Sequence, residues 1–461
     1  MKKTNEKPKR EQWSSKTGFI LAAAGSAVGL GNLWKFPYTA GSNGGGAFVV
    51  VYIVMLFLVG FTLMMAELVL GRHTQLSAVG AYRKVKKKWA WVGFIGVGAS
   101  FLILTFYSVI GGWVLKYIVT AFSGGFNTTD LGALEGIFTT FIGSPVQPII
   151  YHGIFMALTL FIVMGGISGG IEKFSKILMP ALFIMMVVIM IRSVTLPGAM
   201  EGVEFLLKPD FSKIDGSVIL AAAGQVFFSL SLGMGVIIAY GSYLSKDENL
   251  VESAFYIPLI DTIIALLAGL TILPAVFALG FDPAGGPGLL FITLPGVFAK
   301  MPLGSFFAIL FFVLVLFAAI TSSISLLESA VAVCIDEFRW KRKTATIGLA
   351  ILAFLIGVPS SLANGPVMSD MVFIKGLNFF DSMSYMAESI LLPLAGLLLS
   401  IFIGWVWGVD KAIAEATNDG KVKFSLAFIW GFLIKWVVPV AIFVILLQST
   451  GILDWILASV K

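Results

Sequence analysis

Apolar runs of about 20 residues recur along the whole chain, which is the length that a helix needs to cross a bilayer. A further apolar stretch at 286–299 is rich in Pro and Gly and is too short to span. The pattern predicts an all-α integral membrane protein. We expect about eleven transmembrane helices, near residues 17–40, 46–71, 91–122, 149–166, 173–195, 217–243, 253–279, 304–335, 345–359, 379–407 and 424–448.

Two of these runs begin with the same six residues. The sequence ILAAAG occurs at Ile20–Gly25 and again at Ile219–Gly224. Each copy continues into a glycine-rich stretch that weakens a helix, SAVGLGN after the first and QVFFSLSLGMG after the second. An alanine-rich hexapeptide can match by chance in so apolar a chain, but chance does not account for breaks at corresponding positions. Paired interrupted helices in the two halves of a membrane protein indicate a transporter's binding site.

The chain divides into two halves of five helices and one extra helix. We expect a single membrane transport domain over residues 1–461, with a first repeat near 10–195, a second near 217–407 and the extra helix near 424–448. Because five is an odd number, the second half begins from the opposite side of the membrane. The repeat is therefore inverted, as it is in many secondary transporters.

Composition and charge support this interpretation. Of the 461 residues, 58% are hydrophobic and 12% are charged, and a soluble protein of this size needs more polar surface. The formal charge of +6 does not indicate nucleic-acid binding, because most Lys and Arg fall in the N-terminal tail and in alternate loops, at 2–16, 72–88, 339–343 and 411–423. By the positive-inside rule these segments are cytoplasmic. We expect a multi-pass protein of the inner (plasma) membrane with a cytoplasmic N-terminus and lipid around it.

Few residues suit enzymatic or metal-cluster chemistry. Cys334 is the single cysteine, so no intrachain disulfide can form, and no Cys/His group has metal-ligand spacing. His73 and His152 lie near predicted helix ends and are given no special role. We expect the protein not to be an enzyme.

The two predicted breaks can form an ion and substrate site. Unwound backbone in a membrane frees carbonyls, which can bind Na⁺ or an ammonium group, and N–H groups of the following half-helix, which can hold a carboxylate. A site with both suits an amino acid. The alternative is close helix packing through small residues. Packing does not account for Asn32 at the break, the serines of FFSLSLG, or Asp261 in mid-membrane.

These residues resemble a known family, the neurotransmitter:sodium symporters. The resemblance is carried by GSAVGLGNLWKFPY and NGGGAF within Gly25–Phe48, and by Ala66–Arg72, Phe106–Trp113, Gly224–Gly235, Phe291–Phe298 and Phe317–Ser325. It covers almost the whole chain and is closest to the bacterial amino-acid branch, but the family's common twelfth helix is missing. The resemblance implies the leucine-transporter fold, with helices 1 and 6 broken, and sodium-coupled import of amino acids by alternating access.

The resemblance implies two sodium sites built from oxygen ligands, which suit a hard cation. The first site would use the Ala27 carbonyl, Asn32, Ser229, Asp261 and the substrate carboxylate. The second would use the carbonyls of Gly25, Val28 and Ala318 and the hydroxyls of Thr321 and Ser322. Ser and Thr in a membrane helix also serve as interhelical contacts, so the second set depends on the other motifs.

The resemblance also implies a substrate pocket. The substrate carboxylate would lie on the Leu30 and Gly31 amides and the Tyr107 hydroxyl. The ammonium would lie on carbonyls of Ala27, Phe228 and Ser229, helped by Ser231. The side-chain pocket would be lined by Ile103, Tyr107, Phe228, Met234, Ser322 and Leu326. This lining favours an apolar or aromatic amino acid, and a flexible Met234 favours several substrates.

Asp261 departs from the family pattern, which usually has Asn here and a chloride-linked Ser or an acid one turn later. This chain has Asp261 and Ala265. A carboxylate in the membrane is costly unless paired and is a functional candidate by default. The hypothesis is that Asp261 supplies in fixed form the negative charge that chloride gives elsewhere, so that transport is chloride-independent. The alternative is a buried Asp that only forms hydrogen bonds.

Further residues resemble the family's gates. Lys35 and Asp381 would form the outer gate, above a lid of Phe228 and Tyr107. At the inner side Arg10 would pair with Asp336, braced by Trp13 near Tyr243, and Glu67 would accept hydrogen bonds from the unwound sixth helix. The alternative for each charged pair is a solvated surface charge. Glu328 and Glu388 lie within predicted helices and receive no role.

The fifth helix begins with a Gly and Pro pattern. Gly170 and Pro180 frame the sequence GIEKFSKILMP. Pro destabilises a helix interior by ~3 kcal/mol. The hypothesis is that this segment unwinds to let water reach the second sodium site, and the alternative is an ordinary Pro kink.

Other function classes fit less well. A channel needs a continuous polar pore, and a membrane enzyme needs a constellation of His, Cys or carboxylate residues that this chain lacks. A sodium-independent amino-acid exchanger and a transport-inactive sensor of the same fold both stay open. The main prediction is a sodium-coupled symporter of apolar or aromatic L-amino acids.

Overall fold

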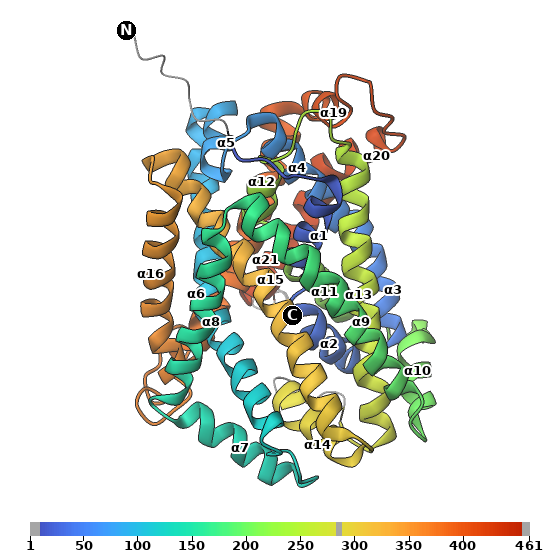
Figure 1. The fold of residues 1–461 in the computed structure, drawn as a ribbon. Helices are drawn as coiled ribbons and strands as arrows, with labels where there is room; N and C mark the ends of the chain where they lie inside the picture. The colour runs from blue at the N-terminus through green and yellow to red at the C-terminus, as the bar shows by residue number, and fades with distance from the viewer. Residues whose placement is uncertain (1–9, 283–287, 454–461) are drawn as a thin grey trace.

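Helices are the only regular elements among residues 10–282 and 288–453, the part of the chain that the computed structural model describes (Figure 1). Nine of these helices are long and apolar enough to cross a membrane, and the count reaches ten if one bent pair is taken as a single span. The sequence predicted about eleven. The difference is the sixth predicted span, whose halves are each too short to count: one helix of 14 residues and one of 6.

The first five spans and their connections follow the chain order that the sequence predicts. Their helices, in order, are α1 (Lys16–Ala27), η1 (Gly31–Lys35), α2 (Phe36–Ser42), α3 (Gly46–Met55), η2 (Leu56–Gly60), α4 (Phe61–Thr74), α5 (Ala78–Val85), η3 (Lys87–Trp89), α6 (Ala90–Phe122), α7 (Leu131–Gly143), α8 (Gln147–Met164), η4 (Ile167–Glu172), α9 (Lys173–Val194), α10 (Ala199–Leu207) and η5 (Phe211–Lys213).

The remaining spans follow after a second broken helix. Their helices are α11 (Gly216–Ser229), α12 (Val236–Gly241), α13 (Leu250–Ala278), η6 (Leu289–Thr293), α14 (Leu294–Lys300), α15 (Gly304–Phe338), α16 (Arg342–Leu362), α17 (Phe379–Ser384), η7 (Tyr385–Leu391), α18 (Leu392–Ile401), η8 (Phe402–Gly408), α19 (Val409–Ala416), α20 (Ala427–Phe432), η9 (Leu433–Val437) and α21 (Val438–Ser449).

The apolar stretch near 286–299 forms a short helix, η6 with α14, at one end of the molecule (Figure 1). The residues of this stretch before Gly288 lie outside the described part. At 12 residues, Leu289–Lys300 is shorter than a span, as its sequence predicts.

Polar side chains define where several helices begin. Ser15 caps α1 by accepting a hydrogen bond from the Gly18 amide. Asp215 caps α11 by accepting from the Ser217 and Val218 amides, and Asn249 caps α13. The Ser217 hydroxyl and the Val218 amide hold the pKa of the Asp215 carboxyl below its ordinary value. These caps fix the starts of the first, sixth and seventh spans.

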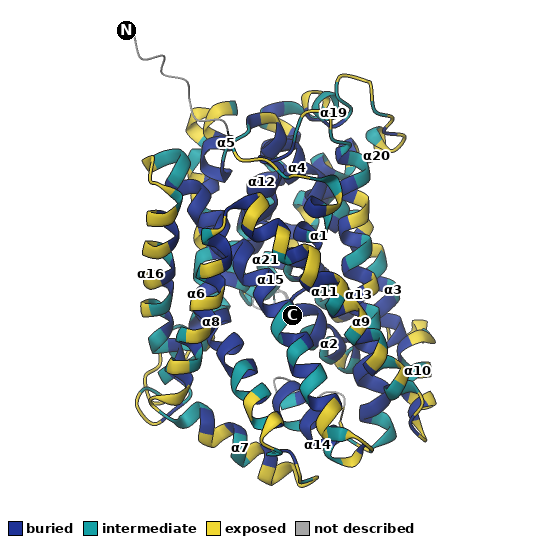
Figure 2. Ribbon diagram, viewed as in Figure 1, coloured by how far each residue is buried: buried dark blue, intermediate teal, exposed yellow. Residues whose placement is uncertain are grey.

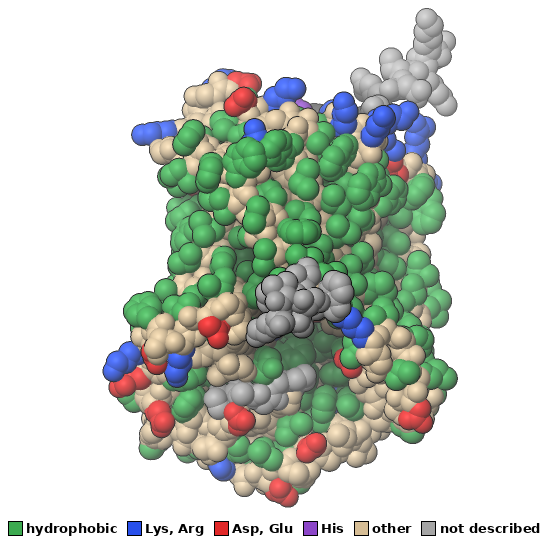
Figure 3. Space-filling model, turned by 180° about the vertical axis from the view of Figure 1, so that it is seen from behind, with side chains coloured by type: hydrophobic (Ala, Val, Ile, Leu, Met, Phe, Trp, Pro, Cys, Tyr) green, Lys and Arg blue, Asp and Glu red, His purple; other side chains and the backbone are tan. Residues whose placement is uncertain are grey.

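The two ends of the molecule differ in charge. Lys and Arg side chains gather at the end that carries the N-terminal segment, and most of the visible Asp and Glu lie at the other end, with a broad hydrophobic band between them (Figure 3). We name these the basic end, marked by α5 and α19, and the acidic end, marked by α7, α10 and α14 (Figure 1). Residues 1–9 of the basic tail lie outside the described part.

The spans bury a shared centre and expose apolar side chains outward. The longest helices, α6 and α15, pack against each other, and α1 packs against α13 and α15 (Figure 2). On the outside, Phe161 and Phe428 are 69% and 88% exposed. Such side chains suit a lipid environment. The broken first span therefore lies in the protein interior, surrounded by helices on several sides.

Candidate functional site

The first and sixth spans both break near their middles. The first bends by 52° between α1 and η1, where Val28 takes an extended backbone conformation. The sixth breaks between α11 and α12, where Ser231, Gly233 and Gly235 have φ values of +53°, +75° and +67°. Glycine adopts such angles freely, whereas Ser231 does so at a cost in strain. The predicted pair of broken helices is thus present.

The two breaks satisfy each other's backbone. Ser231 Oγ donates to the Ser26 carbonyl at 3.0 Å, and Gln225 Nε2 donates to the Gly31 carbonyl at 3.1 Å. The Gly233 amide donates to Glu67 Oε1 at 2.7 Å, which is the contact predicted for Glu67. Unwound backbone in a membrane needs such partners.

A buried carboxylate lies beside the first break. Asp261 is fully buried, and its Oδ1 accepts a hydrogen bond from Asn32 Nδ2 at 2.8 Å. Ser229 Oγ and Tyr52 Oη lie 2.8 and 3.2 Å from Oδ2. We call Asn32, Tyr52, Ser229 and Asp261 the Asp261 cluster. All partners of this carboxylate among the described residues are neutral.

The Asp261 cluster contains three of the predicted ligands of the first sodium site. The fourth, Ala27, ends α1 directly before the break and is 4% exposed. Tyr52 was not predicted. The only signal for it in the sequence is a hydroxyl within the otherwise apolar run GGGAFVVVYIVMLF.

A second group of oxygen atoms lies on the other side of the first break. Thr321 Oγ1 lies 3.0 Å from the Ala318 carbonyl and 3.5 Å from the Val28 carbonyl. Ser322 Oγ also lies 3.5 Å from the Val28 carbonyl. Gly25 passes close by, because a Cβ there would lie 3.2 Å from Thr321 Cβ. The structure therefore brings together all five residues predicted for the second sodium site.

A small cavity lies between the two breaks. All eleven residues predicted for a substrate pocket line it, together with Ser26 and Gly29. The lining is Ser26, Ala27, Gly29, Leu30, Gly31, Ile103, Tyr107, Phe228, Ser229, Ser231, Met234, Ser322 and Leu326. The Leu30 amide donates to Tyr107 Oη at 3.3 Å. These two groups are among those that we expect to bind the carboxylate of the substrate.

Ser26 was missed by the sequence interpretation. Its hydroxyl lies 2.6 Å from Ser325 Oγ, and its carbonyl accepts from Ser322 Oγ at 3.2 Å as well as from Ser231. It therefore joins α15 to both breaks. A serine directly after the ILAAAG sequence was its only signal.

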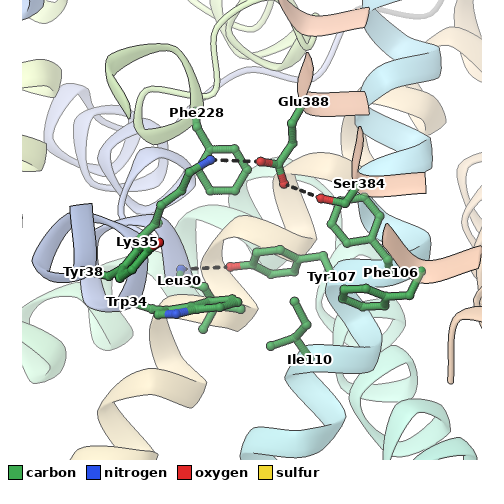
Figure 4. A pocket seen from close by; sticks show the side chains of 12 residues that line it. Leu30, Trp34, Lys35, Tyr38, Phe106, Tyr107, Ile110, Phe228, Ser384 and Glu388 are labelled. Carbon is green, nitrogen blue, oxygen red and sulfur yellow. Dashed lines mark hydrogen bonds and ion pairs between the residues drawn. The ribbon is translucent and has the colours of Figure 1, made fainter. Parts of the chain in front are cut away.

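A wider vestibule adjoins this cavity on the side of Lys35 and Glu388 (Figure 4). Its volume is about 220 Å³, and it shares Leu30, Gly31, Tyr107 and Phe228 with the cavity below. The Phe228 ring lies over Gly31, where a Cβ would approach it to 2.9 Å. Phe228 and Tyr107 thus form a floor to the vestibule and a roof to the cavity.

The outer charged pair differs from the prediction. Lys35 Nζ donates to Glu388 Oε2 at 3.0 Å, and Ser384 Oγ donates to the other oxygen of Glu388 at 3.2 Å (Figure 4). Lys35 forms no ion pair with Asp381, the predicted partner. Asp381 lies at the start of α17, and its amide donates a hydrogen bond to the Asn378 side chain. The prediction of a Lys35–Asp381 pair was wrong, because Glu388 lies two turns further into the same span.

The basic end is closed by the N-terminal segment. Arg10 Nη1 lies 2.8 and 2.9 Å from the two oxygens of Asp336, and its guanidinium lies 4.6 Å from the centre of the Tyr243 ring. Trp13 Nε1 donates to the Tyr240 carbonyl at 3.0 Å. The Arg10 and Asp336 side chains are 16% and 10% exposed, so this is not a pair of solvated charges.

Glu328, which received no role from the sequence, lies behind this closure. It is fully buried, and Arg342 donates to its two oxygens at 2.6 and 3.0 Å. Tyr243 Oη donates to Glu328 at 2.7 Å. A buried acid with a charged partner and further hydrogen bonds is stabilised in place. Tyr243 therefore contacts both charged pairs of the inner closure.

The start of the fifth span is helical in this structure. Gly170 lies in η4, and Pro180 lies inside α9. The unwinding predicted for this segment is therefore absent here. Gly170 packs tightly, because a Cβ there would lie 2.2 Å from the Ile162 carbonyl.

An inverted pair of broken helices around a central cavity, flanked by two groups of oxygen atoms, defines a secondary transporter of the leucine-transporter fold. The chain belongs to the sodium:neurotransmitter symporter family, whose model matches residues 10–130 and 140–454.

Known relatives agree with this assignment. The chain is 44% identical to an uncharacterized sodium-dependent transporter of Bacillus subtilis, YhdH, over 96% of this chain and 98% of the relative. It is 39% identical to an uncharacterized sodium-dependent transporter of Haemophilus influenzae, over 97% of this chain and 99% of that one. The crystal structure of MhsT in complex with L-phenylalanine superposes with a TM-score of 0.88 at 44% identity, covering 96% of this chain and 100% of that chain.

Proposed function

We propose that the chain is a sodium-coupled symporter that imports apolar and aromatic L-amino acids by alternating access. The observation that carries the proposal is Asp261. This fully buried carboxylate has only neutral partners among the described residues, and an uncompensated buried charge costs several kcal/mol. A small cation bound beside it removes that cost, and the oxygen atoms of Asn32 and Ser229 suit Na⁺.

The central cavity supports an amino acid as the second substrate. Amides that follow the first break can hold a carboxylate, and carbonyls before the second break can hold an ammonium group. Ile103, Phe228, Met234 and Leu326 make the rest of the lining apolar. The relative MhsT was solved with L-phenylalanine, which agrees in class with this lining. A flexible Met234 favours several side chains over one.

Two sodium ions would move with each amino acid in this proposal. The second ion would lie between the carbonyls of Gly25, Val28 and Ala318 and the hydroxyls of Thr321 and Ser322, which are all neutral groups. Each Na⁺ that moves inward yields ~2.3 kcal/mol per 100 mV and ~1.4 kcal/mol per tenfold gradient. Two ions together can concentrate an amino acid by several orders of magnitude.

Transport would be independent of chloride. Asp261 supplies a fixed negative charge beside the first sodium site, and Ala265, one turn later, offers no hydroxyl to bind an anion. The family position that binds chloride in other members would therefore have no function here.

The proposed orientation puts the basic end on the cytoplasmic side of the inner membrane, as the positive-inside rule favours. Arg10, Asp336 and Trp13 would then close the cytoplasmic side, and Lys35 with Glu388 would close the outer side above Phe228. The structure corresponds in this view to a state closed toward the cytoplasm.

Equilibrium binding of labelled L-phenylalanine to the purified protein tests the proposal. Binding in NaCl and its loss in KCl or choline chloride support it. Binding that is equal in all three salts supports the sodium-independent exchanger instead. Sodium-dependent binding without uptake into vesicles supports the transport-inactive sensor.

A further inference from the structure

Two carboxylates join the N-terminal segment, residues 10–15, to η4 at the start of the fifth span. Glu172, in η4, accepts hydrogen bonds from the N-terminal segment, and Glu11, in the N-terminal segment, accepts one from η4. Neither carboxylate belongs to the substrate cavity, the oxygen clusters or the charged pairs predicted as gates. Each of the two elements therefore supplies an acceptor to the other.

Glu172 is almost completely buried, at 1% exposure. Its Oε2 accepts a hydrogen bond of 2.7 Å from the Ser14 amide. Its Oε1 accepts from Ser14 Oγ at 2.6 Å and from Ser15 Oγ at 2.9 Å. Its fourth contact is Lys176 Nζ, at 2.7 Å on its own span. Three of the four donors to this carboxylate therefore belong to the residues directly before the first span.

Glu11 forms the reciprocal contact. Its Oε2 accepts a hydrogen bond of 2.8 Å from the amide of Ile167, the first residue of η4. The first amides of a helix have no partner within the helix, so an acidic side chain stabilises them. The other oxygen of Glu11 lies 3.0 Å from Arg342 Nε, and Arg342 holds Glu328. Glu11 thus connects η4 to the inner closure.

Gly18 makes the approach of Glu172 possible. A Cβ at position 18 would lie 2.0 Å from Glu172 Oε1, which no side chain can tolerate without displacing the carboxylate. Gly18 also donates its amide to Ser15 Oγ, and the same Ser15 hydroxyl contacts Glu172. A single alanine at this position therefore tests the contact without changing any charge.

We propose that Glu172 is a positioning residue of the inner gate, and that Glu172 and Glu11 couple release of the N-terminal segment to unwinding of η4. This inference rests on the proposed function, in which sodium leaves toward the cytoplasm once the inner closure opens, and on the hypothesis that the start of the fifth span unwinds. If the N-terminal segment left alone, Glu172 would keep only Lys176 of its four donors, and the Ile167 amide would lose its acceptor. Unwinding of η4 brings both groups to water and removes both penalties. Each movement therefore lowers the cost of the other.

Hydrogen–deuterium exchange tests the coupling without any transport measurement. The first variant is Asp336→Asn, which weakens the Arg10 pair and does not touch η4. Coupling predicts that the amides of 167–172 exchange about tenfold faster in this variant, because opening the N-terminal segment opens η4. The control is Glu337→Gln, which breaks a pair with Arg83 at the same end and leaves that exchange unchanged. Unchanged exchange of 167–172 in Asp336→Asn overturns the inference.

The reverse direction uses Glu172→Gln and Gly18→Ala. Both should raise exchange across residues 10–15 and raise the phenylalanine concentration for half-maximal uptake about tenfold, because the state closed toward the cytoplasm is less populated. Maximal uptake should stay within about twofold of wild type. A local change in η4 alone, with residues 10–15 and the half-maximal concentration unaffected, overturns the inference. If wild type binds no amino acid, the exchange measurements still decide on the coupling, whereas the proposed function fails.

Discussion

Lys35 Nζ lies 3.0 Å from Glu388 Oε2 and 4.3 Å from the centre of the Phe228 ring. One ammonium group therefore contacts the acid of the tenth span and the aromatic lid of the central cavity at the same time. Cation–π contact and a hydrogen-bonded carboxylate both favour this position of the lysine. Closing of the outer side and ordering of Phe228 are linked through Lys35.

Glu388→Gln should weaken substrate binding from outside. The pair is partly exposed, with side chains 39% and 23% accessible, so we expect a moderate effect of about three- to tenfold on the half-maximal concentration for uptake. Asp381→Asn is the matched control in the same span and should change it less than twofold. Equal effects of the two variants would contradict the assignment of Glu388.

Asp261→Asn should raise the sodium concentration for half-maximal phenylalanine binding at least about tenfold, because the amide offers the ion no charge. Wild-type uptake should be the same when gluconate replaces chloride. Uptake by wild type that falls sharply in gluconate would refute chloride independence, whatever the variant does.

Met234→Phe should narrow the range of substrates. Met234 is 3% exposed in the cavity lining, and Ser329 holds its carbonyl, so a rigid ring there takes space from the substrate. We expect tryptophan and phenylalanine uptake to fall about tenfold or more relative to leucine. Competition between labelled leucine and each aromatic amino acid measures this ratio, and an unchanged ratio argues against Met234 as part of the pocket.

Pro180→Ala should slow release toward the cytoplasm. Alanine removes a helix-destabilising residue worth ~3 kcal/mol in an interior position, so the wound state of α9 is favoured. Maximal uptake should fall about tenfold, whereas equilibrium binding from outside should be unchanged. Pro359→Ala, in α16 at the periphery, serves as the control. Unchanged transport by Pro180→Ala would favour the ordinary kink.

Glycines and polar residues in apolar runs carried most of what the sequence could predict. Gly29, Gly31, Gly233 and Gly235 mark the two breaks, since a glycine-rich stretch within a membrane helix weakens it locally. The residues predicted around these breaks line one cavity, because each break lies beside it. The membrane-spanning helices also follow the apolar runs of the sequence. The sixth is the exception, because each half of this broken helix is too short to cross a membrane alone.

Contacts between distant segments could not be predicted in the same way. Tyr52 and Asp261 are 209 residues apart in the sequence and meet only in the folded structure. Glu388 and Asp381 both lie in the tenth span, and only the three-dimensional structure decides which one faces Lys35. Glu172 is an ordinary helix residue by its sequence, and its contact with Ser14 depends on Gly18. Side-chain direction across helices is not encoded in local patterns.

The most direct measurement is uptake of labelled L-phenylalanine into proteoliposomes that contain the purified protein. We expect accumulation above the outside concentration when sodium is higher outside, further accumulation when the inside is negative, and none when potassium replaces sodium on both sides. Asp261→Asn should accumulate little in the same assay. Equal uptake with and without a sodium gradient, or no uptake of any apolar amino acid under that gradient, would contradict sodium-coupled import.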